Sequence, residues 1–161
     1  MFKRLIFALL FLSCWPGLAA ANAFVGTKVG LMSVSFDNDA VEDDPGNAGV
    51  ILGYAFTSFI PALSLELDIT RSVAPGRVAN ADLSVETQGL YLSYRSSGTV
   101  YFKGRLGFMD ASLTGNLAED EGGETYGVGL GWRRNVIALE LDYTSIDDDV
   151  SYSSIGVIYH F

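Results

Sequence analysis

The chain has 161 residues and a formal net charge of −9, with 10 Lys and Arg against 19 Asp and Glu. This length allows one modest domain and leaves little room for a two-domain enzyme, while the acidic excess argues against nucleic acid as a partner. A hydrophobic content of 49% excludes a disordered acidic chain, and the single Cys excludes a disulfide framework or a multi-Cys zinc site, so we expect no metal and no cofactor.

Residues 1–23 predict a cleaved signal peptide. Lys3 and Arg4 form a positively charged start, and an apolar run follows from Leu5 to Trp15. Ala21-Asn22-Ala23 then offers a cleavage site with small residues at the two required positions. The apolar run is too short to span a bilayer as a helix of the mature protein.

The mature domain is therefore expected at residues 24–161, and it is expected to be exported across the inner membrane. The alternative is lipid attachment at Cys14, but the preceding residues 11–13 make a poor lipidation signal. No apolar stretch in the mature chain approaches the ~18 residues of a membrane helix. If the protein spans a membrane, it must do so as a closed β-barrel, because only helices and closed barrels satisfy their backbone in lipid.

Eight segments of the mature chain alternate between apolar and polar side chains, which is the period of a β-strand. In chain order they cover residues 24–36, 48–56, 63–70, 83–95, 99–109, 125–133, 136–144 and 151–161. The first segment is ambiguous, because Val29 and Leu31 suggest that Lys28 points inward while Met32 has the same parity as Lys28. A β-bulge would reconcile the two patterns.

The connections between these segments alternate in character. Four are long or acidic and three are short. The long ones are residues 37–47, 71–82, 110–124 and 146–150, and the short ones are residues 57–62, 96–98 and 134–135. An even number of strands, with long loops at one end and tight turns at the other, predicts an all-β fold: an eight-stranded antiparallel up-and-down transmembrane β-barrel.

The two faces of these strands favour a membrane barrel over a soluble one. A soluble barrel needs charged and polar side chains outside, yet the less apolar face here is rich in glycine. Glycine suits the narrow interior of an eight-stranded barrel. The apolar face carries aromatic residues near the strand ends, as do the interfacial girdles of membrane barrels.

Three stretches, residues 126–133, 138–143 and 155–161, resemble the small eight-stranded outer-membrane β-barrel family, which includes the OmpA-like transmembrane domain and the OmpX-like and opacity-protein-like barrels. The resemblance covers essentially the whole mature chain and implies a place in the outer membrane of a Gram-negative cell envelope. It also implies that Tyr159 and Phe161 form the C-terminal signal read by the outer-membrane assembly machinery. Since the sequence stops at Phe161, we expect no peptidoglycan-binding domain after the barrel.

Charged residues on the inner face are the most informative chemistry of the chain. They are expected to form an ion-pair network in the lumen, and they are Lys28, Glu66, Asp68, Lys103, Arg105, Glu140 and Asp142. Long side chains would reach across glycine-rich strands, with Lys103 or Arg105 meeting an acid of the seventh strand. An unpaired buried charge is costly, so the network is expected to plug the lumen. Arg95 and Arg133 are placed at the periplasmic mouth as solvated residues.

The remaining acidic residues are expected in loops as a solvated rim. A second interpretation is that the loop acids bind divalent cations that bridge to lipopolysaccharide phosphates. It is disfavoured because no loop has the spacing of a dedicated calcium site.

His160 is the only His, and we expect it at the periplasmic end, far from the lipid A of the outer leaflet. We therefore expect no enzyme. We expect a monomeric structural or surface-interaction protein with membrane lipid and lipopolysaccharide as its surroundings; the alternative is a small, low-conductance porin-like channel gated by the lumen charges.

Overall fold

The computed structural model describes residues 22–34, 41–57, 60–78, 81–114, 120–146 and 150–161. Most of the predicted signal peptide thus lies outside the described residues, and its cleavage stays a prediction. Among the described residues, no helix is long and apolar enough to cross a membrane.

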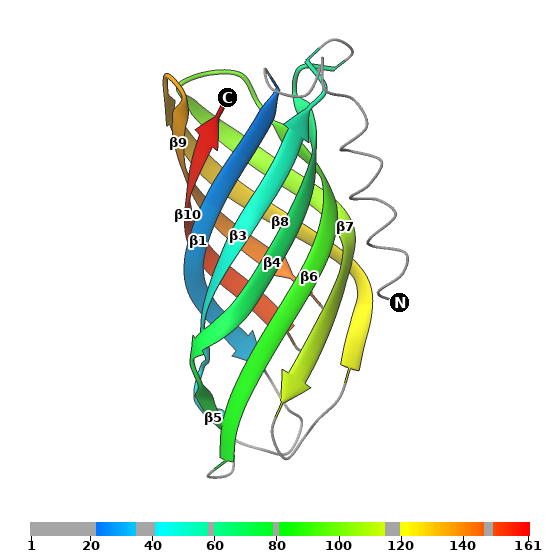
Figure 1. Ribbon diagram of the computed structural model, residues 1–161, viewed down its shortest axis with the longest axis vertical. Helices are drawn as coiled ribbons and strands as arrows, with labels where there is room; N and C mark the ends of the chain where they lie inside the picture. The colour runs from blue at the N-terminus through cyan, green and yellow to red at the C-terminus, as the bar shows by residue number, and fades with distance from the viewer. Residues whose placement is uncertain (1–21, 35–40, 58–59, 79–80, 115–119, 147–149) are drawn as a thin grey trace.

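Eight long strands form one antiparallel sheet that closes on itself (Figure 1). They are β1 (Ala23–Val34), β3 (Gly46–Ala55), β4 (Leu63–Ala74), β6 (Ala81–Arg95), β7 (Val100–Thr114), β8 (Asp120–Arg134), β9 (Ile137–Ser145) and β10 (Val150–His160). Each strand pairs with its neighbour in this order, and β1 pairs with β10 to close the barrel. The predicted eight-stranded up-and-down barrel is confirmed.

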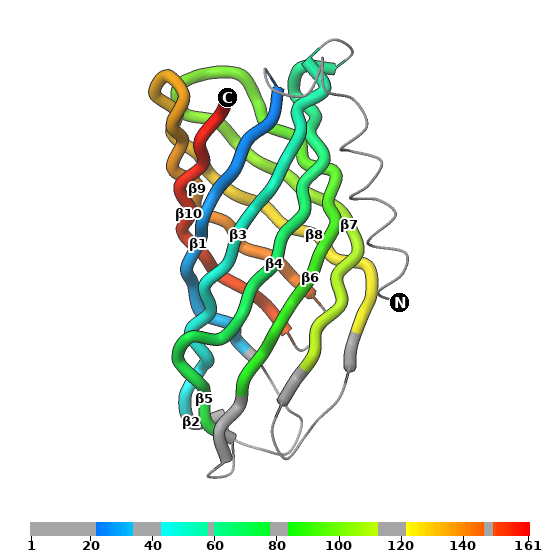
Figure 2. Tube along the Cα trace, viewed as in Figure 1, coloured from blue at the N-terminus to red at the C-terminus, as the bar shows by residue number. Residues whose placement is uncertain are grey.

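Two short strands extend the barrel at one end. β2 (Val41–Asp43) pairs with β5 (Gly76–Val78), and β5 also pairs with the start of β6. This is the end with the long connections, which we call the loop end (Figure 2). The opposite end, the turn end, holds the short turns, the start of β1 and the end of β10 (Figure 1).

The strands run further toward the loop end than the hydrophobic pattern indicates. The predicted loop 71–82 is mostly β4, β5 and the start of β6, and the predicted loop 110–124 is mostly β7 and β8. Their backbone pairing continues, for example between Ala111 and Glu121. Above the hydrocarbon layer the outer face of a strand meets water, so its side chains need not be apolar, while the inner residue Ala111 stays buried and the hydrogen-bond ladder persists.

The predicted bulge in the first strand is wrong. The register of β1 against β10 runs without interruption from Phe24 and His160 to Val34 and Val150. Lys28 and Met32 are both buried inside the barrel. An apolar Met on the inner face is possible because the lumen changes from charged to apolar above Lys28, as described below.

The outer face is apolar around the barrel wall and is highly exposed in the isolated chain. On β7, for example, Phe102, Leu106 and Phe108 are 70%, 68% and 67% exposed. The inner face holds the buried polar and charged residues. The arrangement is that of a protein whose solvent is hydrocarbon.

Strand β7 offers a matched pair of glycine substitutions for testing this packing. A Cβ added at inward-facing Gly107 would overlap the carbonyl oxygen of Leu90, whereas a Cβ at outward-facing Gly104 would have no atom within 4 Å. We expect Gly107→Ala to destabilise the barrel by about 1–3 kcal/mol and Gly104→Ala to change it by less than about 0.5 kcal/mol. Urea unfolding in lipid vesicles, followed by tryptophan fluorescence, measures both. Equal stability of the two variants would contradict the close approach of the β6 backbone to Gly107.

Candidate functional site in the barrel lumen

Four basic and four acidic side chains lie buried in the middle of the lumen. They comprise the seven residues expected from the sequence together with one further arginine. They are Lys28, Glu66, Asp68, Arg95, Lys103, Arg105, Glu140 and Asp142. Their formal charges cancel, and we call this set the lumen network.

The layer nearer the turn end is built around Glu140. Arg95 donates from Nε to Glu140 Oε1 at 2.7 Å and Lys103 donates from Nζ to Oε2 at 2.7 Å. The Tyr101 hydroxyl donates to Oε1 at 2.6 Å. Arg95 also pairs with Glu66, at 2.5 Å between Nη1 and Oε1. Two carboxylates thus hold one arginine from opposite sides of the lumen, because Glu66 lies on β4 and Glu140 on β9.

The layer nearer the loop end is built around Asp68. Lys28 of β1 and Arg105 of β7 both pair with Asp68, the latter at 3.0 Å. Arg105 also donates to the Thr144 hydroxyl on β9. Lys103 adds Asp142 to the network, since its Nζ atom lies 3.1 Å from an oxygen of Asp142 and also pairs with Glu140 and Glu66. The network therefore ties together strands that are not neighbours in the sheet.

Aromatic rings cover the cations of the network. Arg95 lies 5.0 Å from the centroid of the Phe24 ring. Lys28 lies 4.6 Å from the Tyr152 ring centroid. Such contacts attract a cation to the face of the ring and replace water that the buried group has lost.

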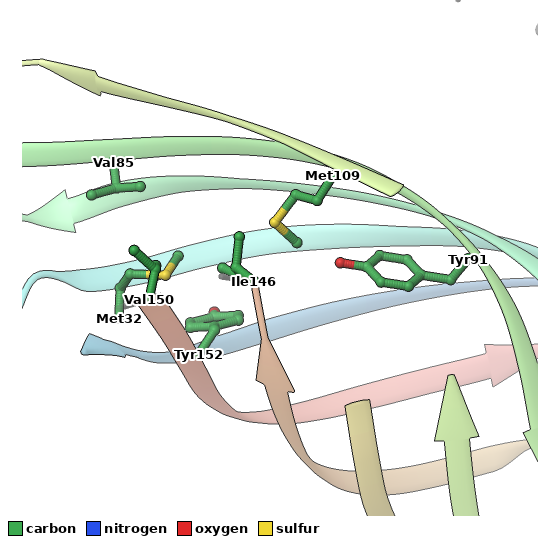
Figure 3. Packing of buried hydrophobic residues seen from close by; sticks show 7 residues of the cluster. All are labelled: Met32, Val85, Tyr91, Met109, Ile146, Val150 and Tyr152. Atoms are coloured by element: carbon green, nitrogen blue, oxygen red, sulfur yellow. The ribbon is translucent and has the colours of Figure 1, made fainter. Parts of the chain in front are cut away.

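Apolar clusters flank the network on both sides. The cluster toward the loop end, shown in Figure 3, contains Met32, Val85, Tyr91, Met109, Ile146, Val150 and Tyr152. The cluster toward the turn end contains Phe24, Ile51, Tyr101, Ala138 and Ile158. The described lumen therefore places a charged but overall neutral middle between two apolar clusters.

Glycines on β8 make room for these side chains. A Cβ at Gly129 would overlap Asp142, and a Cβ at Gly131 would overlap the Tyr101 ring. Side chains of β7 and β9 thus lie over the glycines of β8, which is the strand between them. Lys103 reaches Glu140 and Asp142 across it, whereas Arg105 pairs with Asp68 of β4 across the strand on the other side of β7, β6.

Arg95 is the residue that the sequence interpretation placed wrongly. It was expected to be solvated at the mouth, but it is only 8% exposed and binds two carboxylates. Two signals could have identified it: it shares the inward parity of Tyr91 and Ser93, and the predicted set lacked one positive charge. Arg133 lies at the turn end, half-buried and 5.0 Å from the Tyr101 ring centroid.

The predicted acidic rim is only partly described. Asp37, Asp39, Glu119 and residues 147–149 lie outside the described residues. Asp43, Asp44 and Glu124 are exposed at the loop end, Glu124 within β8 rather than in a loop. In the described part of the chain, no three His, Cys, Asp or Glu side chains are grouped as a metal site requires.

The last strand presents its C-terminal aromatic residues to the outside. Tyr159 is 45% and Phe161 62% exposed, and their ring centroids are 5.2 Å apart. The backbone amide of Phe161 donates to the carbonyl of Ala23 at 3.0 Å, so the end of the chain is fixed to the start of β1.

A closed barrel with an apolar outer face and a charged interior defines an integral outer-membrane β-barrel protein. The chain belongs to the outer membrane protein beta-barrel domain family, whose model matches residues 5–161. The protein is therefore placed in the bacterial outer membrane, where such barrels turn their short connections to the periplasm and their long ones to the cell exterior. The turn end is thus periplasmic and the loop end extracellular.

Solved outer-membrane barrels share the fold at low sequence identity. Ail, the attachment invasion locus protein of Yersinia pestis, is 15% identical with a TM-score of 0.64, covering 88% of this chain and 99% of its own. Neisserial surface protein A is 17% identical with a TM-score of 0.58, covering 86% and 97%. The N-terminal barrel of Pseudomonas aeruginosa OprF is 14% identical with a TM-score of 0.57, covering 87% and 98%. No curated protein sequence matches the chain.

Removing one carboxylate tests the energetic weight of the lumen network. Glu140→Gln keeps the side-chain shape but leaves Arg95 and Lys103 with excess charge, so we expect a loss of about 3–5 kcal/mol in the free energy of unfolding. The matched control is Glu86→Gln, which breaks an exposed pair with Arg71 at 2.9 Å. We expect the control to cost less than about 1 kcal/mol.

The comparison also includes a charge-balanced variant. Arg95→Met combined with Glu140→Gln removes one charge of each sign and leaves Glu66 and Asp142 paired with Lys103, so it should recover part of the stability lost in Glu140→Gln alone. Urea unfolding in vesicles measures all three variants. If Glu140→Gln and Glu86→Gln lose the same stability, the network does not stabilise the barrel.

Proposed function

We propose that this protein is a closed outer-membrane barrel with a structural or surface-interaction role. One observation carries the proposal: the middle of the lumen is filled by a neutral network that lies between two apolar clusters. A barrel whose lumen is filled offers no pathway through the membrane, so its role is to anchor the protein there. The parts available for interaction are then those outside the membrane. The similar barrels include an attachment invasion locus protein and a surface protein.

The described loop end supports lipopolysaccharide and outer-membrane lipid as surroundings. Arg71 and Arg77 are exposed there, and arginine is suited to phosphate groups. The apolar wall can be solvated by lipid alone, which favours a monomer. Tyr159 and Phe161 remain our proposed recognition signal for the assembly machinery, in keeping with their exposed position at the end of β10.

A narrow channel is the second candidate, and one observation favours it. Several buried polar atoms have no hydrogen-bond partner among the described residues, and those in the lumen include Asp68 Oδ1, Ser93 Oγ and Arg105 Nε. They lie on the neighbouring strands β4, β6 and β7, so unsatisfied polarity is concentrated on one side of the lumen. Ionisable residues inside a membrane are functional candidates, and a rearranged network would open along this side.

Planar-bilayer conductance distinguishes the two candidates. For a closed barrel we expect no channel events from the wild type, and none from Lys103→Ala or Glu140→Ala. Discrete events in the wild type, or events that appear only when one partner of the network is removed, would support the gated channel and overturn the closed barrel. Unboiled samples that migrate faster than boiled ones on a gel provide the control that each variant is folded.

We further propose that the barrel has no lipid-modifying activity. His160 lies at the periplasmic turn end, half-buried against the Phe24 ring at 5.2 Å between centroids. Lipid A lies in the opposite leaflet. Mass spectrometry of lipid A from cells that overexpress the protein should match the spectrum from cells that carry an empty vector. A new lipid A species, absent from cells expressing His160→Gln, would establish an enzyme.

A further inference from the structure

Asn22 and Ala23, at the start of the described chain, are hydrogen-bonded into the barrel. The carbonyl oxygen of Asn22 accepts from the Ala55 amide at 2.8 Å, and the carbonyl oxygen of Ala23 accepts from the Phe161 amide at 3.0 Å. The side-chain oxygen of Asn22 also accepts from the Thr57 hydroxyl at 2.8 Å. These two residues therefore join the start of β1 to the end of β3, to the turn that follows β3, and to the end of β10 (Figure 1).

The predicted signal peptide offers two positions for its removal. Signal peptidase requires small residues at the last and the third-last positions before the cut. Residues 21–23 (Ala-Asn-Ala) meet this requirement, and so do residues 19–21 (Ala-Ala-Ala). The later cut gives a mature chain that begins at Phe24, as expected above, and the earlier cut gives one that begins at Asn22.

The hydrogen bonds at the turn end favour the earlier cut. A signal peptide is removed during export, so only the residues after the cut are present when the barrel forms in the outer membrane. A cut before Phe24 would delete the two acceptor carbonyls and the Asn22 side chain, and the amides of Ala55 and Phe161 would lose these partners. Each lost hydrogen bond weakens the closure of the sheet at this end.

The position of the new α-amino group gives the same preference. Phe24 is 2% exposed, and the Arg95 guanidinium lies 5.0 Å from the centroid of its ring. A cut before Phe24 would therefore attach an ammonium group to a buried residue that packs against a cation, which is costly. Asn22 is only half-buried, and a chain that begins there keeps its ammonium group at the edge of the barrel.

We propose that signal peptidase cuts between Ala21 and Asn22, and that Asn22 and Ala23 are the first structural residues of the barrel. Hydrolysis of this peptide bond by water leaves a carboxylate on Ala21 and the free α-amine on Asn22. The assignment is independent of whether the lumen conducts ions.

Mass spectrometry of the protein purified from outer membranes tests the position of the cut. We expect the mass and the N-terminal sequence of a chain that begins at Asn22. A chain that begins at Phe24 is lighter by one Asn and one Ala residue, and its detection as the product would overturn the proposal. A chain that keeps the signal peptide, or one that begins at a lipid-modified Cys14, would overturn it as well.

Two matched substitutions identify the residues that the peptidase reads. Ala19→Phe places a large side chain at the third-last position of the earlier cut only, and Ala23→Phe places one at the last position of the later cut only. We expect Ala19→Phe to lose the product that begins at Asn22, and Ala23→Phe to retain it. The opposite result would show that the cut follows Ala23.

Two barrels of different length test the structural role of Asn22 and Ala23. One begins at Asn22 and the other at Phe24, and each is released from a fusion partner by a protease that leaves no extra residue. Both are folded into lipid vesicles and unfolded with urea. The chain that begins at Phe24 should unfold at a lower urea concentration, because its sheet lacks the hydrogen bonds to Ala55, Thr57 and Phe161. Equal midpoints would overturn the structural role of the two residues.

Discussion

The structure of this barrel depends on charge compensation in a space that water does not fill. A narrow eight-stranded barrel has room for side chains and little else, and hydrocarbon surrounds it. Each ionised group inside must find its counter-charge within the lumen, because an unpaired buried charge would cost several kcal/mol. Glu140 and Asp68 do so by binding two cations each, which makes the charges a shared network rather than separate pairs.

The same constraint explains the glycines. A charged side chain that reaches its partner across an intervening strand needs that strand to be bare, and β8 provides Gly129 and Gly131 at the crossing points. The composition of one strand is thus set by the length of the side chains on its neighbours. Apolar residues at both ends of the network, such as Met109 and Ile158, then exclude water from the charged middle.

Much of this could be predicted from the sequence, because lipid outside and a narrow lumen inside impose a strict alternation on residues such as Leu65 and Glu66. The ends of the strands could not be predicted, because the alternation of apolar and polar side chains stops where the outer face meets water. The backbone pairing continues past that point, through Ala111. Arg95 was missed because it lies at the last position of its strand, where an arginine ordinarily reaches water. Which partner Arg105 selects was also beyond the pattern, because Asp68 of β4 and the two acids of β9 are each separated from β7 by one strand.

The position of Lys28 has a consequence for how the chain inserts. It is the one member of the lumen network on β1, and β1 forms the seam with β10. Lys28 binds Asp68 on β4, and β4 is connected to β1 through β3, so no ion pair of the described network crosses the seam. The lumen charges can therefore be compensated while the cylinder is still open, and its completion adds the backbone ladder between β1 and β10 and the contact of Lys28 with the Tyr152 ring.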